Sequence, residues 1–125
     1  MGIGRFEDII AWRKAKELTI LIYDHCRDFG FKDQIQRASV SIMNNIAEGY
    51  ERKSNNEFRQ FLYIAKGSCG EVRSMLLLAD ELNKIDKKQI SKYLSLRRNF
   101  QNIIRLHQNH VNNSKPDFQL YTFNF

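Results

Sequence analysis

Proline and long apolar runs are both scarce in this chain. Its 125 residues contain one proline, Pro116, so the sequence before it is free to form long helices that an internal proline would break. No apolar run reaches the roughly 18 residues of a membrane span. The residues after Met1 lack the apolar stretch of a secretory signal peptide. We therefore expect one cytoplasmic domain that contacts no membrane.

Cysteine and histidine are also rare, which limits the available chemistry. Cys26 and Cys69 have apolar neighbours in predicted helices, and we expect both to be buried free thiols in a reducing compartment. No glutamate has a histidine three residues later, which excludes the Glu-x-x-His pattern of di-iron bundles. His107 and His110 lack a third ligand at helical spacing. The sequence therefore predicts no metal, no cofactor and no evident small-molecule substrate.

Motifs for nucleophilic catalysis and phosphate binding are missing as well. The chain has no Gly-x-Ser-x-Gly elbow and no glycine-rich phosphate loop. Gly67-Ser68-Cys69-Gly70 resembles a nucleophile turn, but an apolar heptad pattern continues through it. Ser68 and Cys69 should therefore face packing partners, and the sequence favours a non-enzymatic protein.

Charge is balanced over most of the chain and one-sided at its end. Residues 84–125 carry eight Lys and Arg against two Asp, which accounts for the whole formal net charge of +6. Such a one-sided field selects anionic partners. On a helical wheel at about 100° per residue, one side of the last predicted helix is basic. Its cations are Lys84, Lys87, Lys88, Arg98 and Arg105, with Lys92 at the edge and Arg97 directed into the apolar stripe.

Apolar periodicity predicts four helices, at about residues 8–28, 33–49, 54–82 and 86–110. Gly30 should end the first helix with a positive φ angle. The other three helices begin at capping boxes, in which a polar residue is followed three positions later by Glu or Gln. The boxes are Asp33 with Gln36, Ser54 with Glu57, and Asp86 with Gln89.

The third helix has the most regular pattern. One heptad row is Phe58, Ala65, Val72 and Ala79, and the second is Phe61, Ser68, Met75 and Leu82, with Leu62, Cys69 and Leu76 beside it. Gly67 and Gly70 lie inside this helix, where each costs about 1 kcal/mol relative to alanine. We expect a close backbone approach by another helix to compensate, the alternative being a tolerated weak point.

Together these patterns predict an all-α fold. Residues 1–111 should form an up-and-down four-helix bundle. Residues 112–125 should form an extended C-terminal tail, because the aromatic residues Tyr121, Phe123 and Phe125 alternate at period two. We expect this tail to dock on its own bundle or on a neighbouring subunit, with disorder as the alternative.

Two segments, residues 41–49 and 61–71, resemble the signature of the 23S rRNA intervening-sequence protein (S23) family of small bacterial four-helix bundles. The matching positions are Ser41, Ile42, Asn45, Ile46, Ala47, Glu48, Gly49, Ala65, Gly67, Ser68 and Glu71. The resemblance implies a four-helix bundle of undefined biochemical activity. It also implies self-assembly, since related members, including accessory proteins of diversity-generating retroelements, form ring-like homopentamers.

The structural signature that the resemblance assigns to this chain comprises Arg37, Asn45, Glu48, Gly49, Gly67 and Glu71. Its polar members lie on the second and third predicted helices. Buried polar residues at a helix interface need partners, so we expect Glu48 or Glu71 to pair with Arg37. The alternative is a ligand site.

The leading functional hypothesis is an oligomeric nucleic-acid-binding or adaptor protein. The residues expected to contact RNA or DNA are Lys84, Lys87, Lys88, Lys92, Arg98 and Arg105. No base-reading motif is present, so we expect little sequence specificity. Three alternatives remain: a solvated surface, a scaffold for an acidic protein partner, and a ribonuclease. The last is suggested by Arg105 and His110, whose spacing is similar to the Arg-x4-His motif of HEPN-type ribonucleases.

Overall fold

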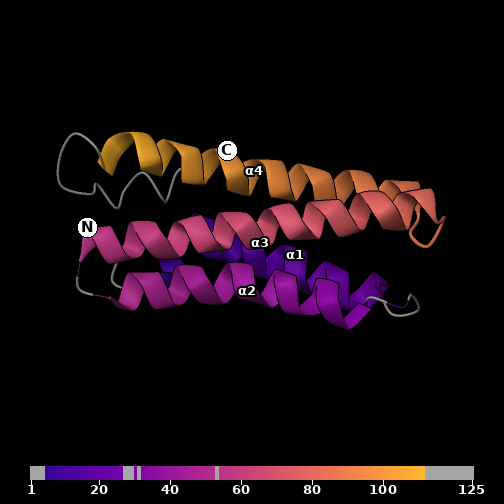
Figure 1. The fold of residues 1–125 in the computed structure, drawn as a ribbon, viewed down its shortest axis with the longest axis horizontal. Helices are drawn as coiled ribbons and strands as arrows, with labels where there is room; N and C mark the ends of the chain where they lie inside the picture. The colour runs from indigo at the N-terminus through magenta and orange to yellow at the C-terminus, as the bar shows by residue number, and fades with distance from the viewer. Residues whose placement is uncertain (1–4, 27–29, 31, 53, 112–125) are drawn as a thin grey trace.

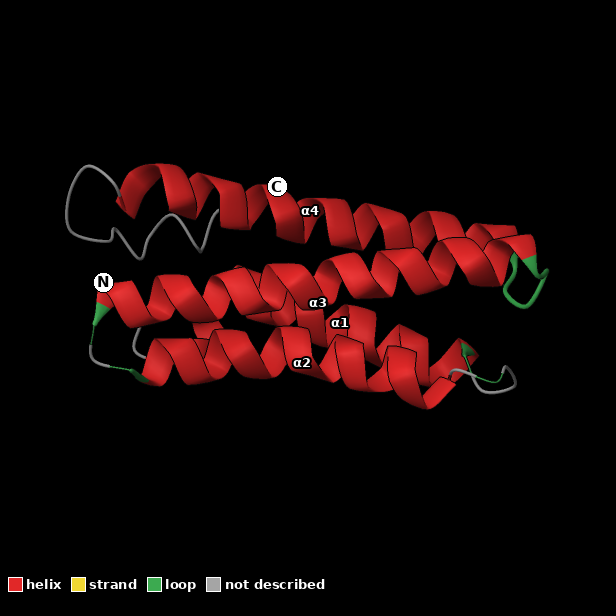
Figure 2. Ribbon diagram, viewed as in Figure 1, coloured by secondary structure: helices red, strands yellow, loops and turns green. Residues whose placement is uncertain are grey.

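The computed structural model describes residues 5–26, 30, 32–52 and 54–111. Its elements are a 3-10 turn η1 (Phe6–Asp8) and the helices α1 (Ile10–His25), α2 (Lys32–Glu51), α3 (Asn55–Glu81) and α4 (Lys87–Val111). The helices lie side by side along one axis (Figure 1). No strand occurs among these residues (Figure 2). The predicted all-α four-helix bundle is confirmed, whereas the expected tail, 112–125, lies outside the described residues.

Each helix packs against the next one along the chain, and α4 closes back on α1. The connections are short, as up-and-down topology requires. The α2–α3 pair packs most extensively. Gly49 faces Phe61 and Ser41 bonds to Ser68, so these two helices run antiparallel. No described helix combines the length and apolar character needed to cross a bilayer.

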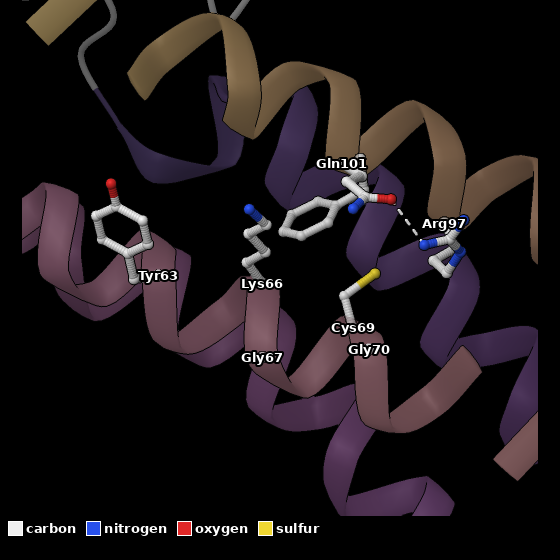
Figure 3. Close-up of a pocket in the computed structure, with 8 residues that line it drawn as sticks. Tyr63, Lys66, Gly67, Cys69, Gly70, Arg97 and Gln101 are labelled. Atoms are coloured by element: carbon white, nitrogen blue, oxygen red, sulfur yellow. Dashed lines mark hydrogen bonds between the residues drawn. The ribbon is translucent and has the colours of Figure 1, made fainter. Parts of the chain in front are cut away.

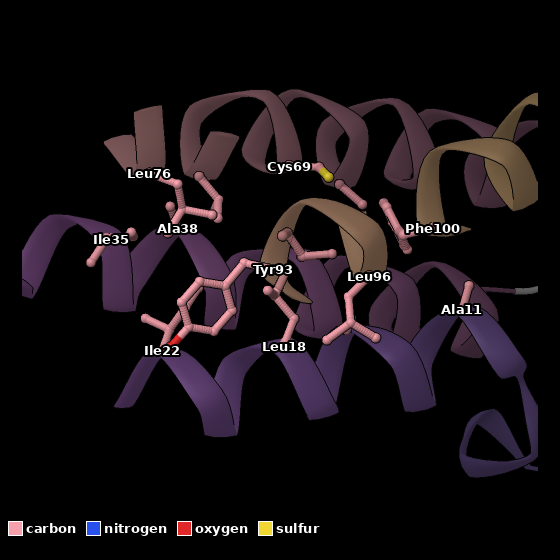
Figure 4. Packing of buried hydrophobic residues seen from close by; sticks show 14 of the residues in the cluster. Ala11, Leu18, Ile22, Ile35, Ala38, Cys69, Leu76, Tyr93, Leu96 and Phe100 are labelled. Carbon is pink, nitrogen blue, oxygen red and sulfur yellow. The ribbon is translucent and has the colours of Figure 1, made fainter. Parts of the chain in front are cut away.

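The core follows a heptad seam along α3. Phe58, Ala65, Val72 and Ala79 are buried, as predicted. The second buried row consists of Leu62, Cys69 and Leu76 rather than the predicted Phe61, Ser68, Met75 and Leu82, which are half-buried or exposed. The observed rows alternate at steps of four and three residues, the spacing of a narrow bundle seam. Figure 4 shows Tyr93 and Leu96 of α4 directed toward Ile22 and Leu18 of α1.

Two of the three predicted caps are present. Ser54 Oγ accepts from Glu57 N at 3.2 Å and donates to Glu57 Oε2 at 3.0 Å, which starts α3. Asp86 Oδ1 accepts from Lys88 N at 3.1 Å at the start of α4. Gln89 does not complete that box, because its Oε1 is buried without a partner among the described residues.

The helix-start prediction at Asp33 is wrong, and so is the helix stop at Gly30. Asp33 already lies inside the first turn of α2, which begins one residue earlier. No described glycine has a positive φ angle, whereas Asn83 does, at 55°. Asn83 ends α3 in a Schellman motif: Lys84 N donates to Ala79 O at 2.9 Å, and Asn83 N donates to Asp80 O at 3.0 Å.

Candidate functional site

The predicted basic face lies on the outer side of α4. Lys87, Lys88, Lys92, Arg98 and Arg105 are all exposed on this helix. The predicted Lys84 is exposed too, but it precedes α4 in the connection from α3 because Asp86 caps the helix. The wheel therefore placed Lys84 wrongly. We call these six residues the basic face.

The cations of the basic face are not neutralised by neighbouring carboxylates. The ion pairs of the described residues all lie within residues 5–52. None of the six side chains forms an ion pair or hydrogen bond with any residue that the structure describes. The stretch from Lys87 to Arg105 covers about 27 Å of helix axis at 1.5 Å per residue. This face therefore presents free positive charge over a length comparable to several phosphate spacings.

A polar cluster from the predicted signature joins α2 to α3. Asn45 Nδ2 donates to Ser41 O at 2.7 Å and to Ser41 Oγ at 3.0 Å. Ser41 Oγ in turn lies 2.9 Å from Ser68 Oγ across the helix interface. All three residues are half-buried. These polar side chains form hydrogen bonds with one another, so they need no ligand. The bond between the two serines fixes how α2 and α3 align.

The expected pairing of Arg37 with Glu48 or Glu71 is wrong. Glu48 Oε1 accepts from Arg52 Nη2 at 3.0 Å, and Arg52 directly follows the last residue of α2. Arg37 and Glu71 are exposed and form no ion pair within the described part of the chain. The prediction assumed that these side chains are buried. Because water solvates them, neither needs a partner.

The glycines of the signature have different environments. A Cβ atom on Gly49 would lie 2.6 Å from Phe61 Cβ and 2.9 Å from Phe58 Cδ2. Gly49 is therefore the site where α2 and α3 approach closely. A Cβ on Gly67 or Gly70 would meet nothing within 4 Å. The predicted close approach at these two positions is wrong, and both instead border open space.

That open space is a cavity of about 360 Å³ between α3 and α4 (Figure 3). It is lined by Tyr63, Lys66, Gly67, Cys69, Gly70, Arg97, Phe100 and Gln101. In Figure 3 the Cys69 thiol points from α3 toward α4, with Lys66 on one side and Arg97 on the other. We call this cavity the interhelical pocket. The sequence did not predict it.

Arg97 is the charged group of the pocket that lies deepest between the helices. It is half-buried, as its predicted inward direction implies. Its Nη1 donates to Gln101 Oε1 at 2.7 Å, while its Nε is buried without a hydrogen-bond partner among the described residues. Burial lowers the pKa of Arg97. Cys69 raises this pKa, and the nearby cations Arg73 and Arg98 lower it further. The pocket is therefore lined by a half-buried cation, Arg97, whose Nε–H has no acceptor among the described residues.

The cysteines are buried free thiols, as predicted. Burial raises the pKa of Cys69 to about 11, although Arg97 acts in the opposite direction. Burial also raises the pKa of Cys26 to about 11. Both groups are therefore protonated at neutral pH, and a protonated thiol is a weak nucleophile.

The other candidate chemical groups are dispersed. Within the described residues, no three His, Cys, Asp or Glu side chains are grouped so that they could hold a metal ion. Arg105 is exposed on α4. The side chain of His110 lies outside the described part of the structure, so the Arg105–His110 pair stays a prediction.

Comparisons with known proteins found a matching family and a solved structure with a similar fold. The family model described as 23S rRNA-intervening sequence protein matches residues 7–106. A crystal structure from Bacteroides thetaiotaomicron VPI-5482, described as a protein of unknown function from the S23 ribosomal protein family, is similar with a TM-score of 0.69. The match is 22% identical and covers 75% of this chain and 94% of the other. No curated protein matches the chain.

Proposed function

Because the chain belongs to the 23S rRNA-intervening sequence protein family, we propose that it is a non-enzymatic protein that binds the phosphate backbone of RNA or DNA. The observation that carries the proposal is the basic face of α4. Its six cations are exposed, and none is paired with a described carboxylate. Lys and Arg in this state release counterions from nucleic acid when they contact phosphates, and this release drives binding.

Binding of this kind has little dependence on base sequence. The aromatic residues described on α4, Tyr93 and Phe100, are buried, and Tyr93 Oη donates to Leu21 O at 2.9 Å. They are therefore not available to stack on unpaired bases, which is how most single-strand binders hold their ligand. Long flexible lysines supply charge without fixed geometry. We accordingly expect a backbone binder without base preference.

Self-association would multiply this surface. The family resemblance implies a homo-oligomer, with a pentamer as the expected number. Support in this chain comes from Ile64 and Leu78 on one side of α3 and from Leu82, the C-cap residue that follows this helix. They are 51%, 49% and 51% exposed. Ile20 of α1 is exposed as well, but most of the exposed large apolar residues of the described chain lie on α3. An assembly that covers them would repeat the basic face in every subunit.

The test is charge reversal on the basic face, with an equal charge change elsewhere as control. Lys88→Glu with Arg98→Glu removes two exposed cations of α4, and Lys16→Glu with Lys32→Glu makes the same change on α1 and α2. Each protein is titrated into a fluorescent duplex RNA at several salt concentrations. We expect the α4 variant to bind at least about tenfold more weakly. Its salt slope should become shallower by up to about 1.8, since each lost phosphate contact removes about 0.9. The control should stay close to the unmodified protein.

Three results would contradict the proposal. Equal weakening in both double variants would mean that net charge, not the α4 surface, attracts RNA. Competition by polyglutamate as effective as competition by RNA would favour a scaffold for an acidic protein. Cleaved RNA on a gel, with cleavage lost in His110→Ala, would favour the ribonuclease hypothesis. An oligomeric state that is unchanged in the α4 variant is required for the comparison to be valid.

A further inference from the structure

Three residues of the interhelical pocket are unexplained by packing within the chain. Gly67 and Gly70 lie in the middle of α3, where glycine weakens a helix relative to alanine. No neighbouring atom requires their small size, because a Cβ at either position would meet nothing within 4 Å. Both line the same cavity as Arg97. A molecule that approaches the α3 backbone from the pocket would explain why side chains are missing there.

Arg97 gives the pocket a preference for charge. A buried donor without an acceptor is unfavourable, and the Arg97 Nε is such a donor. Gln101 satisfies the guanidinium at only one described atom, Nη1. Lys66 adds a second cation to the lining. No acidic residue is among the described residues that line the cavity, so an anion would meet two positive side chains there and no negative one.

The rest of the lining is suited to an apolar body. Phe100 and Cys69 are buried, and Tyr63 stands at the end of the pocket away from Arg97 in Figure 3. The Cys69 thiol is protonated at neutral pH, so it adds no negative charge. A volume of about 360 Å³ is near the lower end of small-molecule sites, which span roughly 300–1,000 Å³. The space therefore fits a single ring or a short chain and excludes a nucleic-acid duplex.

We propose that the interhelical pocket binds a small organic anion, a carboxylate or phosphate monoester carried on one ring or a short apolar chain. Arg97 donates to the oxygens of the anion, and Lys66 adds charge to the same pocket. The apolar body packs on Phe100 over the bare backbone of Gly67 and Gly70. This site does not depend on the basic face: Arg97 is half-buried between α3 and α4, whereas the adjacent Arg98, about 100° further round the helix, is exposed to solvent.

The adjacent arginines provide a matched pair of variants. Arg97→Gln and Arg98→Gln remove the same charge, but only the first removes a pocket donor. Binding of phenyl phosphate, phenylacetate and the neutral benzyl alcohol is measured by shifts of backbone amide NMR signals. We expect at least one of the two anions to bind and to shift the signals of residues 63–70 and 97–101. Arg97→Gln should weaken it by at least about tenfold, the effect of losing a charged hydrogen bond. Arg98→Gln should change it less than about twofold, and the alcohol should bind far more weakly.

A second variant separates loss of the site from loss of the fold. Gly70→Leu places a side chain in open space, so the helix should remain intact while the pocket fills. We expect this variant to unfold at the same or a higher temperature and to lose the anion. The relative affinity of phenyl phosphate and phenylacetate then identifies whether phosphate or carboxylate is preferred.

Several outcomes would overturn the site. One is that neither anion shifts the pocket signals of the unmodified protein. Another is that benzyl alcohol binds as well as the anions, which would make the cavity merely apolar. Equal loss in Arg97→Gln and Arg98→Gln would assign the effect to diffuse charge. RNA binding gives a crossed control: Arg98→Gln should weaken it and Arg97→Gln should not, so failure of this site and failure of the basic face give different results.

Discussion

Glycine has two opposite effects on the bundle, depending on what faces its α-carbon. At Gly49 two phenylalanine side chains of α3 occupy the place where a Cβ would lie. At Gly67 that place is open. Both residues lie inside helices and neither has a positive φ angle. Alanine has the same propensity advantage over glycine at both sites, about 1 kcal/mol, so any difference between the two substitutions comes from contacts.

We predict that Gly49→Ala destabilises the protein and that Gly67→Ala stabilises it. At Gly49 the new methyl group would meet the Phe61 Cβ at 2.6 Å, an atom fixed to the backbone that cannot rotate away. Overpacking of this kind costs about 1–3 kcal/mol, which exceeds the gain in propensity or cancels it. At Gly67 no contact opposes the gain, so the free energy of unfolding should rise by about 0.5–1 kcal/mol. Chemical denaturation followed by circular dichroism measures both.

The two substitutions therefore serve as controls for each other, because both replace a helical glycine with alanine. Stabilisation by Gly49→Ala would mean that α2 and α3 separate at no cost, and the close approach would then have no structural importance. A loss of stability in Gly67→Ala would show that the space beside Gly67 is filled by a contact absent from this structure.

The sequence could predict that these glycines are special but not which role each one has. A glycine inside a heptad pattern indicates a missing side chain and leaves open whether a helix, a ligand or water fills the space. The direction depends on rotation of the helix about its axis. Gly67 and Gly70 of α3 turn away from α2, which lies on the Phe61 side of that helix. Gly49 of α2 turns toward α3. Arg97 differs, because its inward direction followed from its place within an apolar stripe.

Helix α3 owes its limits to short-range hydrogen bonds at both ends. Ser54 and Glu57 satisfy donors at its start, and the Schellman motif around Asn83 satisfies carbonyls at its end. Between these limits α3 supplies seven of the buried core residues. Correct ends matter because a shift in where the helix starts would alter the heptad seam relative to α2.

We predict that Ser54→Ala lowers stability by about 1 kcal/mol, since alanine cannot accept the hydrogen bond from Glu57 N. Asn56→Ala, two residues away in the first turn and also exposed, is the matched control and should be neutral or slightly stabilising. Thermal unfolding followed by circular dichroism compares them. Equal melting temperatures for the two variants would show that water replaces the cap without loss.

The sequence could predict where a helix starts when the cap involves only residues close to one another in the chain. The Ser54–Glu57 box needs only residues three positions apart and the Asp86 cap only residues two positions apart, and both formed. The box at Asp33 failed because α2 begins at Lys32. Its register is fixed by packing along the helix, from Ile35 to Gly49, rather than by one polar residue. The stop at Asn83 was missed because asparagine enters the left-handed region less often than glycine.

At the scale of the whole molecule, the apolar side of α3 and the basic face of α4 have different consequences. Ile64, Leu78 and Leu82 leave apolar surface in contact with water. Burial stabilises an assembly by about 25 cal/mol for each Å² of such surface. The proposed binding by the basic face would gain in a different way. Subunits joined in one particle would bind a long polyanion at several points, and later contacts would form at a high effective concentration.

We predict that Ile64→Glu with Leu78→Glu dissociates the protein and also weakens its binding to long RNA. The unmodified protein should have a molecular mass that is a multiple of the 14.8 kDa chain in light scattering after size exclusion. The double variant should have the mass of one chain, because two carboxylates would have to be buried to reassemble. Gln34→Glu with Asn44→Glu makes the same charge change at exposed polar positions of α2, outside the apolar side of α3, and should leave the mass unchanged.

Because of avidity, the effect of dissociation on RNA binding should depend on the length of the duplex. A dissociated chain retains its own basic face, so its affinity for a duplex too short to reach two subunits should match that of the assembled control. For a duplex that spans several subunits, the control should bind at least about 100-fold more tightly, because linked sites gain roughly 10²–10⁴ without any new contact. Equal affinity of both proteins for the long duplex would show that each bundle binds alone. The apolar side of α3 would then serve some other association than the one that collects phosphate contacts.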